Sequence, residues 1–138
     1  MIENWKIELI AFPVTDIDRA KAFYVDQVGF VADHDASPTE DIRFVQLTPP
    51  GSACSIAFGK GVSTMQPGSL KAVQVVVPSA ADAHAHLRAN GVECSEVIDE
   101  GWGLFVYFSD PDGNSWALQE LPDYAAMAAE GAAAATQP

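Results

Sequence analysis

Apolar and polar residues follow each other along this chain in an order that predicts alternating strands and helices. In the first part of the chain, β-branched and aromatic residues at 6–14 predict a strand. Apolar residues at helical spacing over 17–28 then predict a helix that ends at Gly29. Three further apolar runs predict strands at 30–34, 42–48 and 53–59, separated by a polar loop at 35–41 and a Pro-Pro-Gly-Ser turn. The first part therefore predicts one β-α-β-β-β unit.

The same order of elements returns about 63 residues later. A strand at 70–77 precedes Ser79 and Asp82, which form a capping box at the start of a helix that ends at Asn90 and Gly91. Strands are predicted at 92–98, 104–109 and 115–121. An internal repeat of this length indicates two copies of one supersecondary unit.

The predicted fold class is α+β, with two tandem β-α-β-β-β units that form a cupped, mixed and largely antiparallel sheet. The units span about 6–59 and 70–121 within a single domain at 1–121. Residues 122–138 are a low-complexity, alanine-rich tail, for which weak helix and disorder both remain open.

The last two predicted strands are joined by the sequence DPDGN, at 110–114. The carboxylates of Asp110 and Asp112 suit hydrogen bonds from nearby backbone N–H groups, and Gly113 suits a positive φ. We interpret this turn as scaffold rather than as a ligand-binding loop.

Composition narrows the range of functions. The 138 residues include 19 acidic and 7 basic side chains, for a net charge of −12, which argues against binding to nucleic acid or to an anionic membrane surface. No apolar run reaches the length of a membrane span, and the N-terminus does not resemble a signal peptide. Cys54 and Cys94 have no metal-like spacing, so reduced thiols in a cytoplasmic protein are expected, with a disulfide as the alternative.

The stretches DIDRAKAFYVDQVGF and FSDPDGNSWALQE, together with the repeat, resemble the vicinal oxygen chelate superfamily over residues 6–121. That superfamily includes glyoxalase I, extradiol dioxygenases, fosfomycin-resistance transferases and bleomycin-resistance proteins. The resemblance is more specific for fold than for function, because one fold hosts many activities. It also implies a homodimer, to which Trp5, Trp102 or the linker at 59–69 would contribute.

In metal-dependent members of this superfamily, four inward-facing strand positions hold a divalent metal. Carried over by position, they fall on Leu9, Ser55, Ala72 and Ala117. Leucine and alanine offer no donor atoms, and a single serine hydroxyl is a poor ligand. We therefore expect no metal site and no cofactor.

Alternation along the strands predicts a mostly apolar cup that binds a small hydrophobic or aromatic molecule. The predicted ligand-binding residues are Gln46, Ser55, Gln74, Trp102, Phe105, Tyr107 and Gln119. Two alternatives stay open: the glutamines bond each other or water, and Trp102 is a hydrophobic plug or a dimer contact.

The favoured function is metal-independent binding and sequestration of such a molecule, as in bleomycin-resistance proteins. The alternative is a metal-independent isomerase, lyase or cyclase, for which Tyr107, Glu8 and His34 are the only plausible acid–base groups. A third possibility is a glyoxalase- or dioxygenase-like metalloenzyme with displaced ligands.

Overall fold

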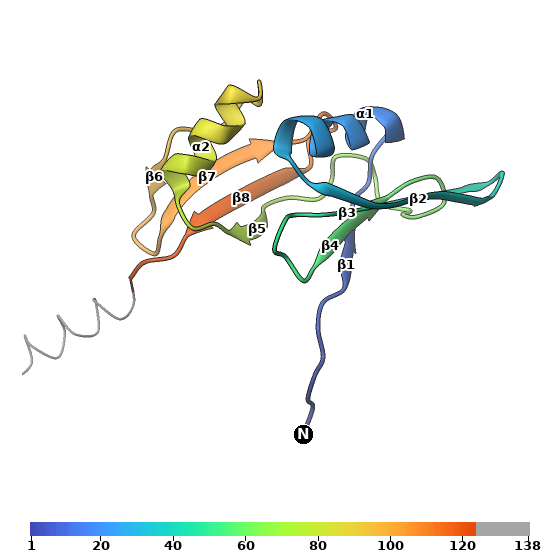
Figure 1. Cartoon of the computed structure of the whole chain (residues 1–138), viewed down its shortest axis with the longest axis horizontal. Helices are drawn as coiled ribbons and strands as arrows, with labels where there is room; N and C mark the ends of the chain where they lie inside the picture. Colours follow the sequence, from blue (N-terminus) through green and yellow to red (C-terminus); the bar gives the residue numbers. More distant parts are fainter. Residues whose placement is uncertain (124–138) are drawn as a thin grey trace, which may run out of the picture.

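The computed structural model describes residues 1–123, and in this part of the chain eight strands form two four-stranded sheets (Figure 1). Residues 124–138, which hold most of the predicted alanine-rich tail, lie outside the described residues. None of the helices within 1–123 has the length and apolar character to cross a bilayer. Cys54 and Cys94 are both free thiols.

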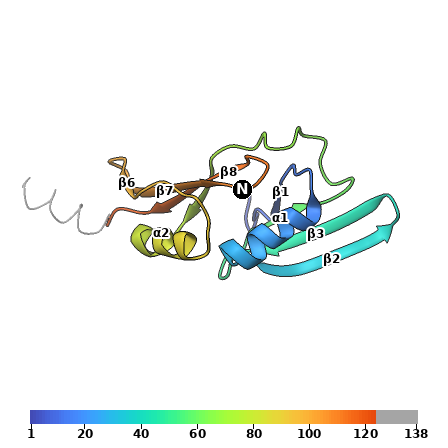
Figure 2. The same cartoon turned by 90° about the horizontal axis from the view of Figure 1, so that it is seen from above.

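The first module has its strands in the order β1-β4-β3-β2. β1 and β4 pair in parallel, and the other two pairings are antiparallel. Its elements are β1 (Leu9–Ala11), α1 (Ile17–Ala22), the π-helical turn η1 (Phe23–Val28), β2 (Val31–Thr39), β3 (Ile42–Thr48) and β4 (Ser55–Phe58). The hairpin of β2 and β3 projects from the body of the molecule (Figure 2).

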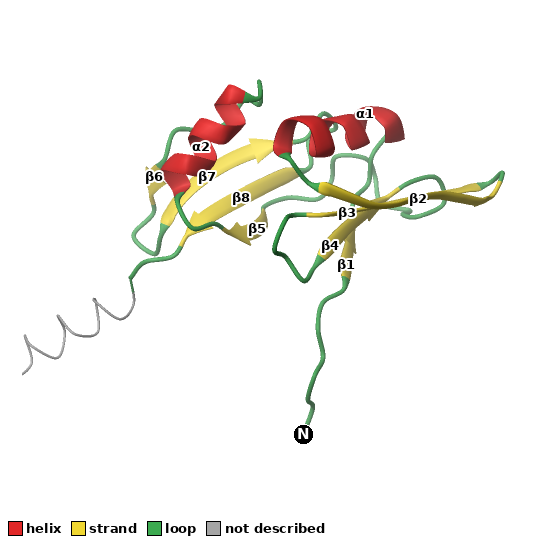
Figure 3. Ribbon diagram, in the orientation of Figure 1, coloured by secondary structure: helices red, strands yellow, loops and turns green. Residues whose placement is uncertain are grey.

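The second module repeats this plan with the order β5-β8-β7-β6, and β5 and β8 are its parallel pair. Its elements are β5 (Val73–Val76), α2 (Ala80–Ala89), β6 (Ile98–Asp99), β7 (Leu104–Ser109) and β8 (Ser115–Glu120). Both helices lie on the same side of the two sheets (Figure 3). The predicted tandem α+β fold is confirmed, with its strands divided between two sheets.

Two strand predictions were wrong in extent. β2 continues to Thr39 through the predicted polar loop, because Asp35 is held there by Arg43 of β3 and Lys21 of α1. The strand predicted at 92–98 is reduced to a bridge at Cys94 and the short β6. There the Ser95 hydroxyl accepts the hydrogen bond of the Tyr107 amide at 2.9 Å and so replaces a backbone acceptor of the ladder.

The helix predicted over 17–28 changes character after Ala22, where it widens into η1. Asp16 caps its start by accepting a hydrogen bond from the Arg19 amide. Gly29 ends it with φ at +102°. The adjacent residues Phe23 and Tyr24 are both buried, which is consistent with the wider π turn directing both toward the core.

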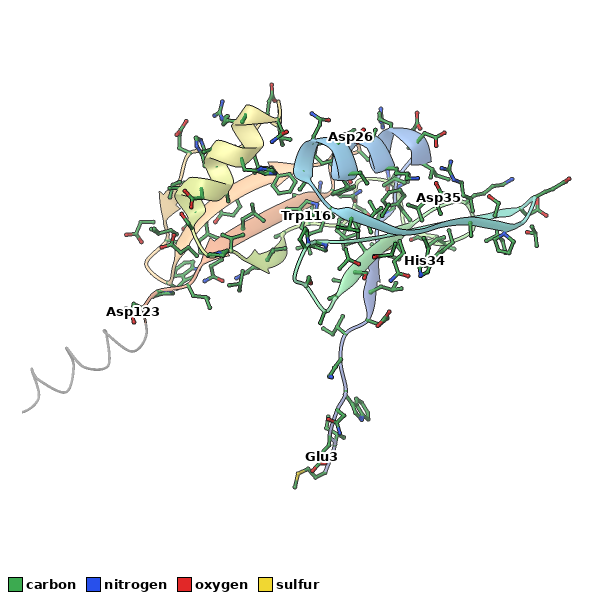
Figure 4. All side chains as sticks on the ribbon, viewed as in Figure 1. Glu3, Asp26, His34, Asp35, Trp116 and Asp123 are labelled. Carbon is green, nitrogen blue, oxygen red and sulfur yellow. The ribbon has the colours of Figure 1, made fainter. Side chains whose placement is uncertain are left out.

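One aromatic core holds both modules together. Trp116 of β8 stacks on Phe12 of the first module, with ring centroids 4.9 Å apart, and on Phe108 of its own module at 5.9 Å. Figure 4 shows Trp116 between the two modules. Its indole N–H donates to the Tyr24 hydroxyl at 3.0 Å. The aromatic core therefore contains residues of both modules.

The DPDGN turn joins the modules through side chains. The Tyr24 hydroxyl donates to Asp110 Oδ2 at 2.8 Å, and the amides of Asp112 and Asn114 donate to Oδ1. Asp112 in turn accepts hydrogen bonds from the backbone N–H and the hydroxyl of Thr15. Gly113 has φ at +98°, so the backbone contacts predicted for this turn are confirmed.

Asp35 gives the β2–β3 hairpin a predictable pH dependence. Hydrogen bonds from Arg43 and then Lys21 hold the pKa of Asp35 far below its usual range. A depressed folded-state pKa stabilises the protein above the unfolded pKa near 4 and loses this contribution as the pH falls. Asp35→Asn should therefore lower the free energy of unfolding by up to about 1 kcal/mol at pH 7. The difference from wild type should shrink below about pH 4.

Urea unfolding at a series of pH values measures this difference. Asp41→Asn is the matched control, because the exposed Asp41 carboxylate lies 4.0 Å from Lys60 and should contribute little. A gap between wild type and Asp35→Asn that stays constant down to pH 2 would contradict the assignment.

Candidate functional site

A cavity of about 500 Å³ opens where β1 and β4 of one sheet approach β5 of the other. Its walls are mainly apolar, with contributions from Ile10, Ile56, Val73, Val75, Val76 and Trp116. Four polar side chains also line it: Ser52, Cys54, Ser55 and Gln74. The cavity thus combines an apolar body with a few fixed polar groups, as small-molecule sites do.

Period-two alternation decides which side chains face the side of the sheets that lies away from the helices, called the open face below; of the open-face residues on β3 and β8 named here, none lines the cavity. On β3, Val45 and Leu47 are fully buried in the helix-side core, which leaves Gln46 and Thr48 on the other face. On β8, Trp116 and Leu118 belong to the core and Ala117 and Gln119 lie on the opposite face. The alternation that the sequence predicts on these strands is confirmed.

The register of β5 corrects the third of the four metal positions. Leu9 is the cross-strand partner of Ser55, and the equivalent partner of Ala117 in the second module is Gln74. Ala72 precedes β5 and has φ at +55°, so it does not occupy the predicted strand position. The third position therefore falls on Gln74, two residues later than predicted.

The corrected set does not fit the metal that the fold family implies. Leu9, Ser55, Gln74 and Ala117 offer one hydroxyl and one amide, whereas transition metals require imidazole, thiolate or carboxylate ligands. Within residues 1–123, no three His, Cys, Asp or Glu side chains are arranged to hold an ion. We therefore derive no chemistry through a metal.

On the second sheet, two of the predicted glutamines bond each other. Gln74 Nε2 donates to Gln119 Oε1, and Gln119 Nε2 donates to the Trp102 carbonyl at 2.9 Å. The indole ring of Trp102 itself stays exposed. For Gln74 and Gln119, mutual bonding thus accounts for their mid-strand position, while Gln46 lies apart on β3 beside His34 and Ala57.

Phe105 and Tyr107 lie on the same face of β7, with ring centroids 5.7 Å apart and nearly parallel planes. The Tyr107 hydroxyl donates to Glu100 Oε1 at 3.1 Å. Burial and then Glu100 raise the pKa of Tyr107, which keeps the phenol protonated at neutral pH. Neither ring lines the cavity.

On the first sheet, the structure reveals a polar chain that the sequence interpretation missed. The Thr48 hydroxyl donates to Asp33, and Thr48 Oγ1 lies 2.7 Å from Ser55 Oγ. The register of β2 shifts between Ala32 and His34, so Asp33 is an extra residue in a bulge that the two-residue period does not predict.

The three predicted acid–base residues are not brought together at the cavity. Tyr107 lies on β7, His34 lies on β2 opposite Gln46, and Glu8 precedes β1. Figure 4 shows His34 on the side of β2 that faces away from α1, opposite to Asp35. None of the three lines the cavity.

Cys54, which does line the cavity, is not an activated nucleophile. Burial and then the nearby Glu8 charge raise the pKa of its thiol. The thiolate is the reactive form, so Cys54 stays a protonated and weakly reactive group at neutral pH.

The two β-α-β-β-β modules, their shared aromatic core and the cavity between their sheets define a class of paired-module α+β proteins. The chain belongs to the Glyoxalase/Bleomycin resistance protein/Dioxygenase superfamily, whose family model matches residues 6–118. The resemblance seen in the sequence is confirmed.

Relatives and solved structures agree with this family. The chain is 31% identical over 121 residues to the uncharacterized protein YetH of Bacillus subtilis (strain 168), covering 83% of this chain and 98% of YetH. It is 32% identical to TnmS3, an antibiotic binding protein from Streptomyces sp. CB03234, with a TM-score of 0.79 over 88% of this chain and 100% of TnmS3. A glyoxalase/bleomycin resistance protein from the same strain is 34% identical, with a TM-score of 0.73 over 83% of this chain and 100% of its own.

Proposed function

We propose that this protein binds and sequesters a small, mainly apolar and ring-containing molecule in the cavity between its sheets, without a metal. The observation that carries this proposal is the cavity of about 500 Å³ with apolar walls and a few polar groups. Cavities of this size and mixture bury most of a drug-sized ligand. Ser55 and Gln74 are its proposed polar contacts. The other predicted ligand-binding residues do not line this cavity: Gln46, Trp102, Phe105, Tyr107 and Gln119.

Similarity to TnmS3 supports a binding function over catalysis. TnmS3 is an antibiotic binding protein, and the two chains share their fold over most of their lengths. The net charge of −12 favours a neutral or cationic ligand over an anion. The ligand of this chain is expected to differ in detail, because the sequences differ at about two-thirds of the aligned positions.

Calorimetric titration with 2-hydroxyphenanthrene, a three-ring aromatic probe, tests the binding proposal. We expect saturable binding of one probe per cavity, and displacement of the probe by small molecules that co-purify with the protein and are identified by mass spectrometry. A protein that binds neither the probe nor any co-purified molecule would contradict the proposal.

Binding is expected to survive metal removal. The four family positions lack a set of metal ligands, so the cavity walls must hold the ligand. Affinity for 2-hydroxyphenanthrene should be unchanged within experimental error after dialysis against EDTA, and elemental analysis should find less than one zinc, nickel, iron or manganese per chain. Loss of binding that added metal restores would contradict the expectation.

We also propose that the chain forms a homodimer. Large apolar side chains are exposed in the single chain: Trp5 is 77% exposed, Ile7 71% and Trp102 63%. Association would cover exposed apolar surface of this kind. Light scattering at micromolar concentration should give twice the mass of the chain, and Trp5→Ser should weaken association. A wild-type monomer would contradict this proposal.

Catalysis remains the alternative function. The absence of Tyr107, Glu8 and His34 from the cavity wall gives no support to an acid–base mechanism there. Incubation of the captured ligand with the protein, followed by mass spectrometry, separates the two functions: an unchanged ligand favours sequestration, and a product of isomerisation or elimination favours an enzyme. A cytoplasmic location stays a prediction.

A further inference from the structure

The hydroxyl and thiol groups of the cavity wall direct their hydrogens into the protein and away from the cavity interior, and among the described polar side chains of the wall Gln74 keeps one amide hydrogen for a ligand. Each of the two polar chains that reach the cavity ends on a group that can only accept a hydrogen bond. Because the end group can only accept, its neighbour must donate to it, and the donor in each earlier hydrogen bond of the chain follows in turn. The last donor fixed in this way is the side chain at the cavity wall.

On the first sheet, the end group is the Asp33 carboxylate, which accepts the hydrogen of Thr48. A threonine hydroxyl has only one hydrogen, so the 2.7 Å contact between Thr48 and Ser55 must use the hydrogen of Ser55. Ser55 is 6% exposed and its hydroxyl hydrogen is therefore directed toward Thr48, not toward the cavity. Its oxygen lone pairs are what it offers to a ligand.

On the second sheet, the end group is the backbone carbonyl of Trp102, which accepts from Gln119 Nε2 at 2.9 Å. The Gln119 amide is thereby oriented with Oε1 toward Gln74, which donates through Nε2. Gln74 is left with its own Oε1, and with the second hydrogen of its amide, for a ligand.

The other two polar side chains of the cavity follow the same direction. The Ser52 hydroxyl donates to the Cys54 carbonyl at 2.8 Å, and the Cys54 thiol donates to the Ser55 carbonyl at 3.6 Å. All hydroxyl and thiol hydrogens on the described cavity wall are thus used within the protein.

We propose that this cavity selects its ligand by hydrogen-bond donors: the ligand class is a ring-containing apolar molecule that carries O–H or N–H groups, which donate to Ser55 Oγ and Gln74 Oε1. At Ser55, a molecule of the same shape that has only acceptors meets oxygen lone pairs and therefore binds more weakly, whereas Gln74 can accept through Oε1 or donate through its second amide hydrogen and does not discriminate. This inference rests on the proposed binding function and adds the chemical class of the ligand.

Two probes of one shape test the inference. 2-Hydroxyphenanthrene carries a donor, whereas 2-methoxyphenanthrene keeps the oxygen but has lost the hydrogen. We expect the hydroxy probe to bind wild-type protein about 10-fold more tightly by calorimetry, since a hydrogen bond contributes about 1 kcal/mol and an unpaired acceptor adds to the loss. Equal affinities would overturn donor selection and leave the binding function intact. Failure of both probes to bind, together with the absence of any co-purified molecule that binds, would overturn both proposals.

Variants of the first chain supply a second, independent measurement. Ser55→Ala should lower the affinity for the hydroxy probe about 5-fold and leave the affinity for the methoxy probe unchanged. Thr48→Val keeps the shape of threonine but removes the acceptor of the Ser55 hydrogen, which can then point at the ligand. The methoxy probe should therefore bind more tightly, and the ratio of hydroxy-probe to methoxy-probe affinity should fall below about 3. Thr48→Ser keeps a hydroxyl and should restore the wild-type ratio.

Thermal unfolding of each variant checks that it still folds. All three changes lie on the open face of the first sheet, so we expect each variant to fold. The ratio of hydroxy-probe to methoxy-probe affinity could be the same in wild type, Thr48→Val and Thr48→Ser. This result would show that Thr48 does not orient the Ser55 hydroxyl, and it would overturn the proposed direction of the hydrogen bonds from Ser55 through Thr48 to Asp33.

Discussion

Replacing Asp110 with alanine should lower the free energy of unfolding by about 3–5 kcal/mol, the largest effect expected for any single side chain outside the aromatic core. Asp110 is 6% exposed and accepts four hydrogen bonds. Two come from side chains, the Tyr24 hydroxyl and Asn114 Nδ2, each at 2.8 Å. Two come from the backbone amides of Asp112 and Asn114. Alanine removes all four acceptor contacts at once and leaves buried donors without partners.

Urea unfolding of two milder variants separates the contributions. Tyr24→Phe removes one donor to Asp110 and leaves its other three contacts in place, but it also removes the acceptor of the Trp116 indole N–H, so it should cost about 1–3 kcal/mol. Asp110→Asn keeps the shape and one carbonyl oxygen, and should fall between Tyr24→Phe and Asp110→Ala. A loss of less than about 1 kcal/mol for Asp110→Ala would mean that the turn is not the joint between the modules.

Replacing Val76 with tryptophan should reduce affinity for 2-hydroxyphenanthrene about 100-fold, which corresponds to about 2.7 kcal/mol. Val76 lines the cavity from β5, next to Gln74 and Val75, and is 61% exposed in the single chain. An indole at this position occupies space that the ligand needs, while the core on the other side of β5 stays as it is.

Val76→Ile is the matched control, because isoleucine adds one methylene and no polar atom and should leave the affinity within about 3-fold of wild type. Both variants should unfold within about 1 kcal/mol of wild type, since the side chain is not part of the buried core. Undiminished binding to Val76→Trp would place the ligand outside this cavity.

The sequence was sufficient to predict the order of elements, because each strand alternates between core and open face with few interruptions. Trp116 and Leu118 are buried with Phe12 and Phe58 in the core, and this burial fixes the direction of every neighbour on β8. The capping residues Asp16 and Ser79 and the DPDGN turn act locally, so their roles were also predictable.

The errors arose where the backbone departs from a regular strand. Ala72 has a left-handed φ that is uncommon for alanine, and the third of the four metal-binding positions of the superfamily therefore falls on Gln74 instead. The bulge at Asp33 placed an acidic side chain next to Thr48, although alternation assigns it no such contact. A Gly/Asn-type turn signal would have revealed an irregularity, but neither site has one.

Long-range partners could not be predicted from local pattern. The bond between Gln74 and Gln119 joins residues 45 positions apart, and the Tyr24 to Asp110 bond spans 86 positions. The sequence left open that the glutamines bond each other, and Gln74 and Gln119 do so. It could not show that Gln119 is oriented by the carbonyl of Trp102.

Trp116 belongs to two environments at once. Its ring is stacked in the aromatic core that joins the modules, and it also forms part of the cavity wall. The cavity therefore exists only while the modules are docked, so an occupied cavity and a folded chain are thermodynamically linked. At a ligand concentration 100 times the Kd, mass action adds about 2.7 kcal/mol to stability. Sequestration would then lengthen the lifetime of the protein in the presence of proteases, and the cell would hold more of it when the ligand is abundant, without any change in its synthesis.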